Sequence, residues 1–184
     1  MDNGSTLYRR YLDGDDEAMV ELIRVYKDGL ILYINGITGN LSLAEELMED
    51  TFFKLAAKKP RFSGKCSFKT WLFTIGRNAA LDSLRKRSHI SDTPLEDRYD
   101  ISDERSIEQD YLREEQKITL HRAMESLSSE YRQVLYLTFF EELSNTEAAA
   151  VMKKSNRQIE NLLYRAKLAL RSKLEKEGFE YERL

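Results

Sequence analysis

The sequence predicts an all-α protein made of two small helical domains joined by a flexible acidic linker, and three observations support this prediction. Only two prolines and eight glycines interrupt the 184 residues, whereas strong helix formers such as Leu, Ala, Glu, Lys and Arg are abundant. Apolar residues recur at steps of three and four in several segments, as they do in amphipathic helices. Residues 88–110 lack this periodicity and are rich in acids. We therefore predict domains over 1–87 and 111–184, separated by that linker.

Cysteine and histidine are too scarce for a disulfide framework or a metal site. The chain has one cysteine, Cys66, and two histidines, His89 and His121, so a disulfide cannot form within it and a zinc site lacks ligands. We expect no metal ion and no cofactor. The polar, acidic N-terminus differs from a secretory signal, and the longest apolar run, 30–34, is too short to span a bilayer. These features predict a soluble cytoplasmic protein with no membrane insertion.

Charge is segregated along the chain, although the net charge is only −3. Residues 11–53 carry ten acids and two bases, a net −8, whereas 58–87 carry nine bases and one acid, a net +8. Residues 91–110 carry eight acids and two bases, a net −6, and 153–176 carry eight bases and two acids, a net +6. A single charge run usually marks a solvated surface. Two basic blocks separated by an acidic block indicate two contacts with a polyanion.

The first domain is expected to hold three helices joined by short breaks. Apolar residues over 19–37 follow helical spacing, and Gly36 and Gly39 are expected to end that helix. Residues 42–45 have the spacing of a capping box, in which Ser and Glu each bond a free backbone N–H at a helix start. The second helix should end before Pro60, because the residue before a proline disfavours helical angles.

A basic loop and a third helix follow in the first domain. Residues 61–67 are predicted to form the loop, and 68–87 the helix. Its apolar stripe consists of Phe68, Trp71, Leu72, Ile75 and Ala79. The second domain begins near Tyr111, with apolar stripes over 120–127 and 131–138 separated by a Ser-Ser break.

A helix-turn-helix is predicted from residues 147–167. Two capping-box spacings, 144–147 and 155–158, mark the starts of a short and a long helix. The small side chain of Ala149 lies where the helices must approach closely. The turn carries Lys153, at a position that often holds glycine because it prefers a left-handed backbone, so we expect a positive φ there.

The exposed start of the long helix offers side chains suited to reading DNA. Arg157 and Asn161 have the donor and acceptor groups that pair with guanine and adenine edges in the major groove. The cationic remainder of the helix suits phosphates. An ordinary helical hairpin with a basic surface is the alternative for this segment alone. The second basic block elsewhere in the chain favours DNA binding.

The chain resembles the sigma-70 family, in its small extracytoplasmic-function branch. Three segments carry the resemblance: AEELMEDTFFKL (44–55), FKTWLFTIGRNAALDSLRKR (68–87), and the helix-turn-helix through LLYRAKLALRSKL (ending at 174). Their order matches a region-2 domain, a linker and a region-4 domain. The departures from the family pattern are Lys153 in the turn and Glu160 on the recognition helix, and they leave open which bases are read.

The resemblance implies three sets of binding residues and no catalytic residue. The set that would dock on the clamp helices of core RNA polymerase is Glu45, Glu46, Glu49 and Asp50. The set that would bind and open the minus-10 promoter element is Phe62, Lys65, Lys69, Trp71, Arg77, Asn78, Arg85 and Lys86, with Arg87 beside them. The set that would bind the minus-35 element is Arg157, Gln158, Glu160, Asn161, Arg165 and Lys167. For Trp71 the alternative is a place in the core, because it falls on the apolar stripe.

The resemblance also implies the partners: core RNA polymerase, promoter DNA and an anti-sigma factor. A second interpretation is a stand-alone helix-turn-helix regulator with an N-terminal sensing domain. That interpretation predicts a ligand pocket or dimer interface before residue 90, where the sequence instead places a basic, aromatic loop and helix. An enzyme ranks last, because we find no phosphate-binding glycine loop, nucleophile elbow or metal-ligand cluster in the sequence.

Overall fold

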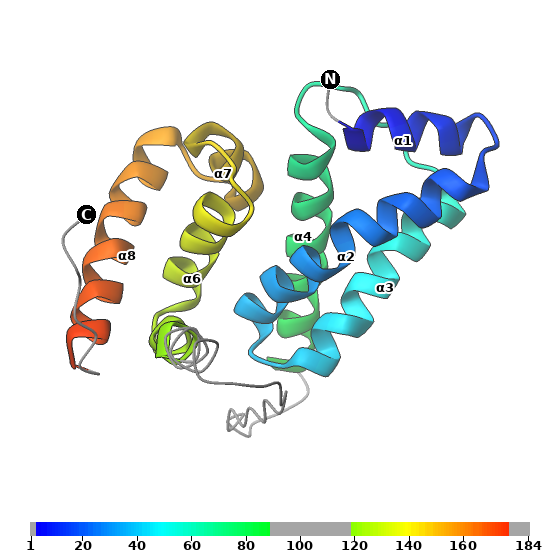
Figure 1. The fold of residues 1–184 in the computed structure, drawn as a ribbon. Coiled ribbons are helices and arrows are strands. Elements are labelled where there is room, and N and C mark those ends of the chain that lie inside the picture. The colour runs from blue at the N-terminus through cyan, green and yellow to red at the C-terminus, as the bar shows by residue number, and fades with distance from the viewer. Residues whose placement is uncertain (1–2, 89–118, 177–184) are drawn as a thin grey trace, which may run out of the picture.

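The computed structural model describes residues 3–88 and 119–176, and every regular element within these ranges is a helix. Figure 1 shows two groups of helices side by side, α1 to α4 from the first range and α6 to α8 from the second. The all-α fold class predicted from the sequence is confirmed. The predicted linker, 88–110, lies outside the described residues apart from Ser88, which ends α4.

The first helix, α1 (Asn3–Leu12), is not anticipated by the sequence patterns. Tyr8 and Tyr11 are buried, and their hydroxyls donate to the carbonyl oxygens of Pro60 at 2.7 Å and Ala56 at 3.0 Å. Burial raises the pKa of Tyr8 to about 12, so its hydroxyl keeps its proton at neutral pH. These bonds fasten α1 to the chain that leads into the basic loop.

The second helix, α2 (Asp16–Thr38), is the long central element of the first group. Among its apolar residues at helical spacing, Leu22, Leu30 and Tyr33 are completely buried. The prediction that Gly36 interrupts the helix is wrong, because α2 continues through it. Gly39, with a φ of 65°, ends the helix in the left-handed conformation that glycine tolerates.

The third helix, α3 (Leu41–Lys58), begins one residue before the predicted cap. The side chain of Asn40, not that of Ser42, accepts from the backbone N–H of Leu43 at 2.8 Å, so the capping box predicted at 42–45 is wrong. Asn is as good an N-cap as Ser, and here it directly follows the glycine that ends α2. The predicted end holds, with Lys59 in the left-handed conformation at φ 42°.

The fourth helix, α4 (Phe68–Ser88), confirms the predicted third helix of the domain. Phe68 and Leu72 of the predicted stripe are fully buried, whereas Trp71 is only partly buried. Gly76 lets α4 approach α2 closely, since a Cβ there would lie 2.7 Å from the Leu30 Cδ1 atom. The first group therefore forms one compact core around α2.

The second group comprises a helical segment over 119–125, α6 (Ser129–Leu135), a π-helical turn η1 (Tyr136–Phe140), α7 (Asn145–Met152) and α8 (Asn156–Lys176). The sequence predicts the break at 128–129 but not the π-helical turn, which lies within the apolar stripe expected as one helix.

Both capping boxes predicted in the second group are confirmed. The hydroxyl of Ser144 accepts from the backbone N–H of Glu147 at 3.3 Å, and the Glu147 carboxylate accepts from the Ser144 N–H at 3.0 Å. Ser155 and Gln158 make the same reciprocal pair, at 3.2 and 2.8 Å. These local bonds satisfy backbone donors that α7 and α8 leave free at their starts.

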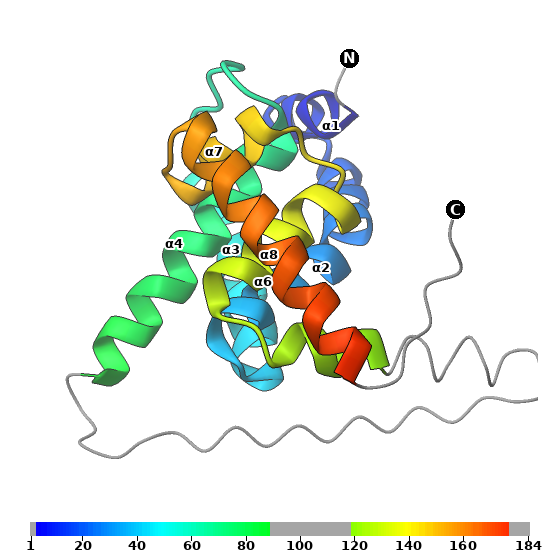
Figure 2. The same cartoon turned by 90° about the vertical axis from the view of Figure 1, so that its left-hand side faces the viewer.

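The two groups pack directly against each other. Helix α2 contacts α6 and η1, and α4 contacts α7. Figure 2 shows the second group in front of α2, while the C-terminal half of α4 extends past it. We call this the closed arrangement. Within the described ranges, the helices lack the combination of length and hydropathy that crossing a bilayer requires.

Candidate nucleic-acid interface

An aromatic cluster lies where the basic loop meets α4. The rings of Phe62 and Trp71 lie 5.2 Å apart between centroids, and those of Tyr8 and Trp71 lie 5.5 Å apart. Phe68 lies beneath them, 5.6 Å from Trp71. Phe62 and Trp71 are half-buried, and Lys65 beside them is exposed. Such a surface offers stacking area together with a cation, which is what an unpaired base and its phosphate require.

The basic end of α4 is open to solvent. Arg85 and Lys86 are exposed, and the Arg85 guanidinium pairs with Asp82 of the same helix at 2.9 Å. An exposed pair of this kind contributes little stability, so phosphate can replace the carboxylate readily. Asn78 is half-buried, one helical turn before Asp82. This part of α4 extends beyond the second group (Figure 2).

Two predicted DNA-binding cations are instead engaged by the second group. The Lys69 ammonium lies 2.7 Å from the carboxylate of Glu141 and donates to the Glu141 carbonyl oxygen at 2.8 Å. Arg77 Nε donates to Oε1 of buried Gln133 at 3.1 Å. The same amide oxygen lies 3.4 Å from the hydroxyl of Tyr33. In the closed arrangement, the Lys69 ammonium and the Nε atom of Arg77 are therefore engaged within the protein.

The Glu147 carboxylate of α7 adds a third contact between the second group and the start of α4. Oε1 of Glu147 accepts from the hydroxyls of Ser67 at 2.9 Å and Thr70 at 3.3 Å. Burial alone would raise the pKa of Glu147, but hydrogen bonds from Ser144, Ser67 and Thr70 outweigh it and hold the pKa below its ordinary value. The stabilisation from this lowered pKa is therefore present at neutral pH and is lost as the pH falls through the lowered value.

Gly29 of α2 makes room for the Glu141 side chain. A Cβ built on Gly29 would overlap Oε1 of Glu141, so any other residue at this position would require the end of the Glu141 side chain to shift from its place against α2. The contact between the two groups thus includes close packing of the Glu141 carboxylate on Gly29.

The four predicted polymerase-docking acids share one exposed face of α3: Glu45, Glu46, Glu49 and Asp50. Leu47 and Met48 between them are buried. Phe53 extends this face with a side chain that is 70% exposed. Sequence reasoning assigned no role to Phe53, although its position, four residues after Glu49, places it on the acidic face.

The helix-turn-helix has the predicted geometry. Lys153 has a φ of 54°, which confirms the expected left-handed turn. Ala149 and Ile159 are buried between α7 and α8. All six predicted minus-35 residues are exposed on α8: Arg157, Gln158, Glu160, Asn161, Arg165 and Lys167.

Two of those six already have partners within the chain. The Gln158 side chain caps its own helix through Ser155, and the Lys167 ammonium lies 4.9 Å from the centroid of the Phe139 ring. Tyr164, 66% exposed, lies one turn beyond Asn161 on the same face. Sequence reasoning missed Tyr164, which helical spacing from Arg157 and Asn161 could have identified.

The comparison with protein families decides between the open interpretations. The family model for Sigma-70 region 2 matches residues 22–90, and the family model for Sigma-70, region 4, matches residues 117–170. The chain belongs to the sigma-70 family. The stand-alone regulator is not favoured, because the first domain matches region 2 and not a sensing domain.

Similar proteins place the chain in the extracytoplasmic-function branch of the sigma-70 family. The RNA polymerase sigma factor YlaC of Bacillus subtilis is 28% identical over 162 residues, which cover 87% of this chain and 94% of YlaC. The ECF RNA polymerase sigma factor SigW of the same organism is 24% identical over 170 residues, covering 88% and 91%. The sigma factor RpoE, solved in complex with the anti-sigma factor NepR from Bartonella quintana, superposes with a TM-score of 0.70 at 25% identity, covering 84% and 95%.

Proposed function

We propose that this sigma factor directs core RNA polymerase to promoters through three surfaces. The acidic face of α3 docks on the polymerase. The aromatic cluster and the basic residues of α4 hold and open the minus-10 element. The exposed start of α8 reads the minus-35 element. The observation that carries the proposal is the row of exposed polar side chains on α8, presented behind a capped left-handed turn.

The aromatic cluster supports strand opening. Phe62 and Trp71 are exposed enough to stack on a base, yet Phe68 and Tyr8 fix them from below. A rigid platform costs little side-chain entropy when a base lands on it, which favours the opened strand. Polymerase supplies the chemistry, and the sigma factor contributes no catalytic group.

The closed arrangement supports a regulated role. Glu141 and Gln133 hold Lys69 and Arg77 in the closed arrangement, so we infer that region 4 leaves region 2 before the minus-10 surface is complete. We propose that core polymerase binding supplies the energy for this opening. An anti-sigma factor, as in the RpoE–NepR complex, would act by preventing it. The protein would act in the cytoplasm, where polymerase and promoter DNA lie.

Run-off transcription with core polymerase on a randomised promoter library tests this function. The expected result is transcription from a selected pair of elements near minus 10 and minus 35, which core polymerase alone does not give. Arg157→Ala should alter the selected minus-35 bases, whereas the matched control Arg171→Ala, farther along α8, should lower output from all promoters equally. Retention of the chain on DNA without any stimulation of polymerase would favour the stand-alone regulator instead.

A further inference from the structure

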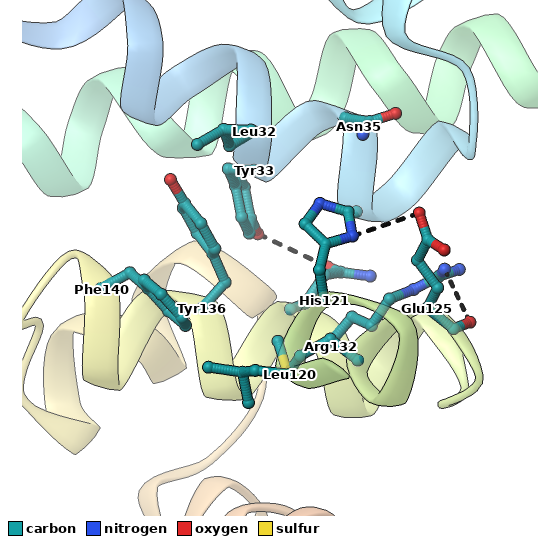
Figure 3. Close-up of a pocket in the computed structure, with 12 residues that line it drawn as sticks. Leu32, Tyr33, Asn35, Leu120, His121, Glu125, Arg132, Tyr136 and Phe140 are labelled. Atoms are coloured by element: carbon teal, nitrogen blue, oxygen red, sulfur yellow. Dashed lines mark hydrogen bonds and ion pairs between the residues drawn. The ribbon is translucent and has the colours of Figure 1, made fainter. Parts of the chain in front are cut away.

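A pocket lies between the two regions, on the face of α2 that meets the second group. Figure 3 shows its walls, with α2 above and the helices of region 4 below. The cavity measures about 250 Å³. Region 2 contributes Leu32, Tyr33, Asn35 and Gly36, and residues from 120 to 140 form the remainder.

The pocket has an apolar end and a polar end. Leu32, Tyr136 and Phe140 line the apolar end, with Leu120 below them (Figure 3). The Tyr136 and Phe140 rings are stacked, with 5.2 Å between centroids. Asn35, His121, Glu125 and Arg132 gather at the other end.

The polar end contains hydrogen-bonding atoms that the chain does not satisfy. Within the described residues, three buried side-chain atoms lack a hydrogen-bond partner, and all three belong to residues of this pocket: Asn35 Oδ1, Glu125 Oε1 and Arg132 Nε. Glu125 Oε1 does lie 3.3 Å from His121 Nδ1, a contact that is an ion pair when the imidazole is protonated. Arg132 is held by its Nη1, which donates to the Glu125 carbonyl at 3.1 Å. Buried polar atoms are normally satisfied, so three unsatisfied ones around a single cavity indicate a missing partner.

We propose that this pocket binds a small amphipathic molecule with a ring-sized apolar body and an amide-like head. The head would accept from Arg132 Nε and donate to Asn35 Oδ1 or to the Glu125 carboxylate, which matches the unsatisfied donor and acceptors. An apolar cavity of about 150 Å³ holds one benzene ring, so the volume here accommodates a ring and a head of a few atoms. An anionic head fits less well, because it would lie beside Glu125.

Such a ligand would hold the closed arrangement together. Because α2 forms one wall and region 4 the other, the complete site exists only while the regions are in contact. A ligand that binds only the closed form shifts the equilibrium toward it. This regulatory part rests on the proposed function, since closure matters only if Lys69 and Arg77 have to reach DNA. The binding of the ligand to the pocket does not depend on the proposed function.

The first test is ligand-observed NMR on the full chain with 2-phenylacetamide as the probe. We expect saturation transfer and a Kd on the order of 1 mM, as for other fragments of this size. Phenylacetate and ethylbenzene are the matched probes for the head, and both should bind about fivefold or more weakly. Gly36→Leu should abolish probe binding, because Gly36 lines the pocket and a Cβ there meets nothing within 4 Å. Gly36→Ala is the control that should keep most of it.

A second variant keeps the test decisive if Gly36→Leu disturbs the fold. Arg132→Met keeps an unbranched side chain out to the position of Nε but removes the unsatisfied donor, so the preference for the amide over ethylbenzene should disappear. Absence of saturation transfer for all three probes, or binding unaffected by both variants, would overturn the proposal. The regulatory part is overturned separately if saturating 2-phenylacetamide leaves the open fraction unchanged at a urea concentration where part of the molecules have separated regions. Neither result depends on transcription, so both are distinguishable from failure of the proposed function.

Discussion

Replacing Gly29 with alanine is expected to open the closed arrangement without removing any charged group. The new Cβ would overlap Oε1 of the Glu141 carboxylate, so the end of that side chain must shift, and we expect the shift to weaken its ion pair with Lys69. Helix α2 itself gains, because alanine is favoured over glycine in a helix interior by about 0.5–1 kcal/mol. The variant therefore separates the stability of region 2, which should rise, from the contact between regions, which should weaken.

The expected weakening of the contact between the regions follows from the geometry of the Lys69–Glu141 ion pair. The Lys69 and Glu141 charges lie 2.7 Å apart, with side chains 29% and 11% exposed. A hydrogen bond between charged groups contributes about 1.5–3 kcal/mol, and the partial exposure of Lys69 favours the lower end. Complete loss of the pair, about 1.5 kcal/mol, sets the largest expected effect, and it lowers the ratio of closed to open molecules about tenfold, since about 1.4 kcal/mol corresponds to a factor of ten.

Single-molecule fluorescence energy transfer measures that ratio. Dyes attached to cysteines at the exposed positions Asp13 and Lys173, in a Cys66→Ser background, report the distance between the regions. The matched control is Gly36→Ala, which makes the same chemical change in the same helix where a Cβ meets nothing within 4 Å. If Gly29→Ala and Gly36→Ala show the same closed fraction, the reasoning about the Lys69–Glu141 contact is wrong.

Three further predictions concern the surfaces of α3 and of the helix-turn-helix. The double reversal Glu46→Lys with Asp50→Lys should weaken core polymerase binding about tenfold in a titration, because both side chains lie on the proposed docking face; unchanged affinity in a folded variant would contradict the role of α3. Arg157→Ala or Asn161→Ala should relax base preference at one or two minus-35 positions by about 1–3 kcal/mol in binding-site selection, and recovery of the parental sequence would mean that other residues read the bases. Lys153→Gly should leave the unfolding temperature unchanged or raise it, by up to about 1 kcal/mol in stability, because glycine relieves the φ of 54°; a clear loss of stability would refute this.

The variants of the α3 face and of the α8 reading residues each have a control variant. Asp13→Lys reverses an exposed acid away from α3 and should leave polymerase affinity nearly unchanged. Arg171→Ala removes a cation of α8 that pairs with Glu175 at 2.8 Å, and it should weaken binding to all sequences alike. Far-ultraviolet circular dichroism establishes that each variant keeps its helices.

Local interactions account for what the sequence predicted well. The capping boxes at Ser144 and Ser155 join residues three apart, and the left-handed Lys153 follows from the turn that separates two such helices. The misplaced cap of α3 is also a local matter, since Asn40 and Ser42 are both good caps and only the backbone after Gly39 decides between them.

Contacts between distant residues account for what the sequence could not show. Lys69 and Arg77 carry the charge expected of DNA-binding residues, but their partners in the closed arrangement lie 72 and 56 residues farther along the chain. Neither the periodicity of the sequence nor the spacing of its motifs predicts such a pair. Helix α1 was missed for a similar reason, because Tyr8 and Tyr11 anchor it to carbonyl oxygens 52 and 45 residues away.

The distance between the two regions on addition of core polymerase tests the central claim most directly. The dyes at positions 13 and 173 report the closed arrangement in the free protein and can be followed during assembly with polymerase and promoter DNA. We predict that the energy transfer changes to an open state as the complex becomes active in run-off transcription, because Lys69 and Arg77 must leave Glu141 and Gln133 to reach DNA. A transcribing complex that keeps the energy transfer of the free protein would contradict this account.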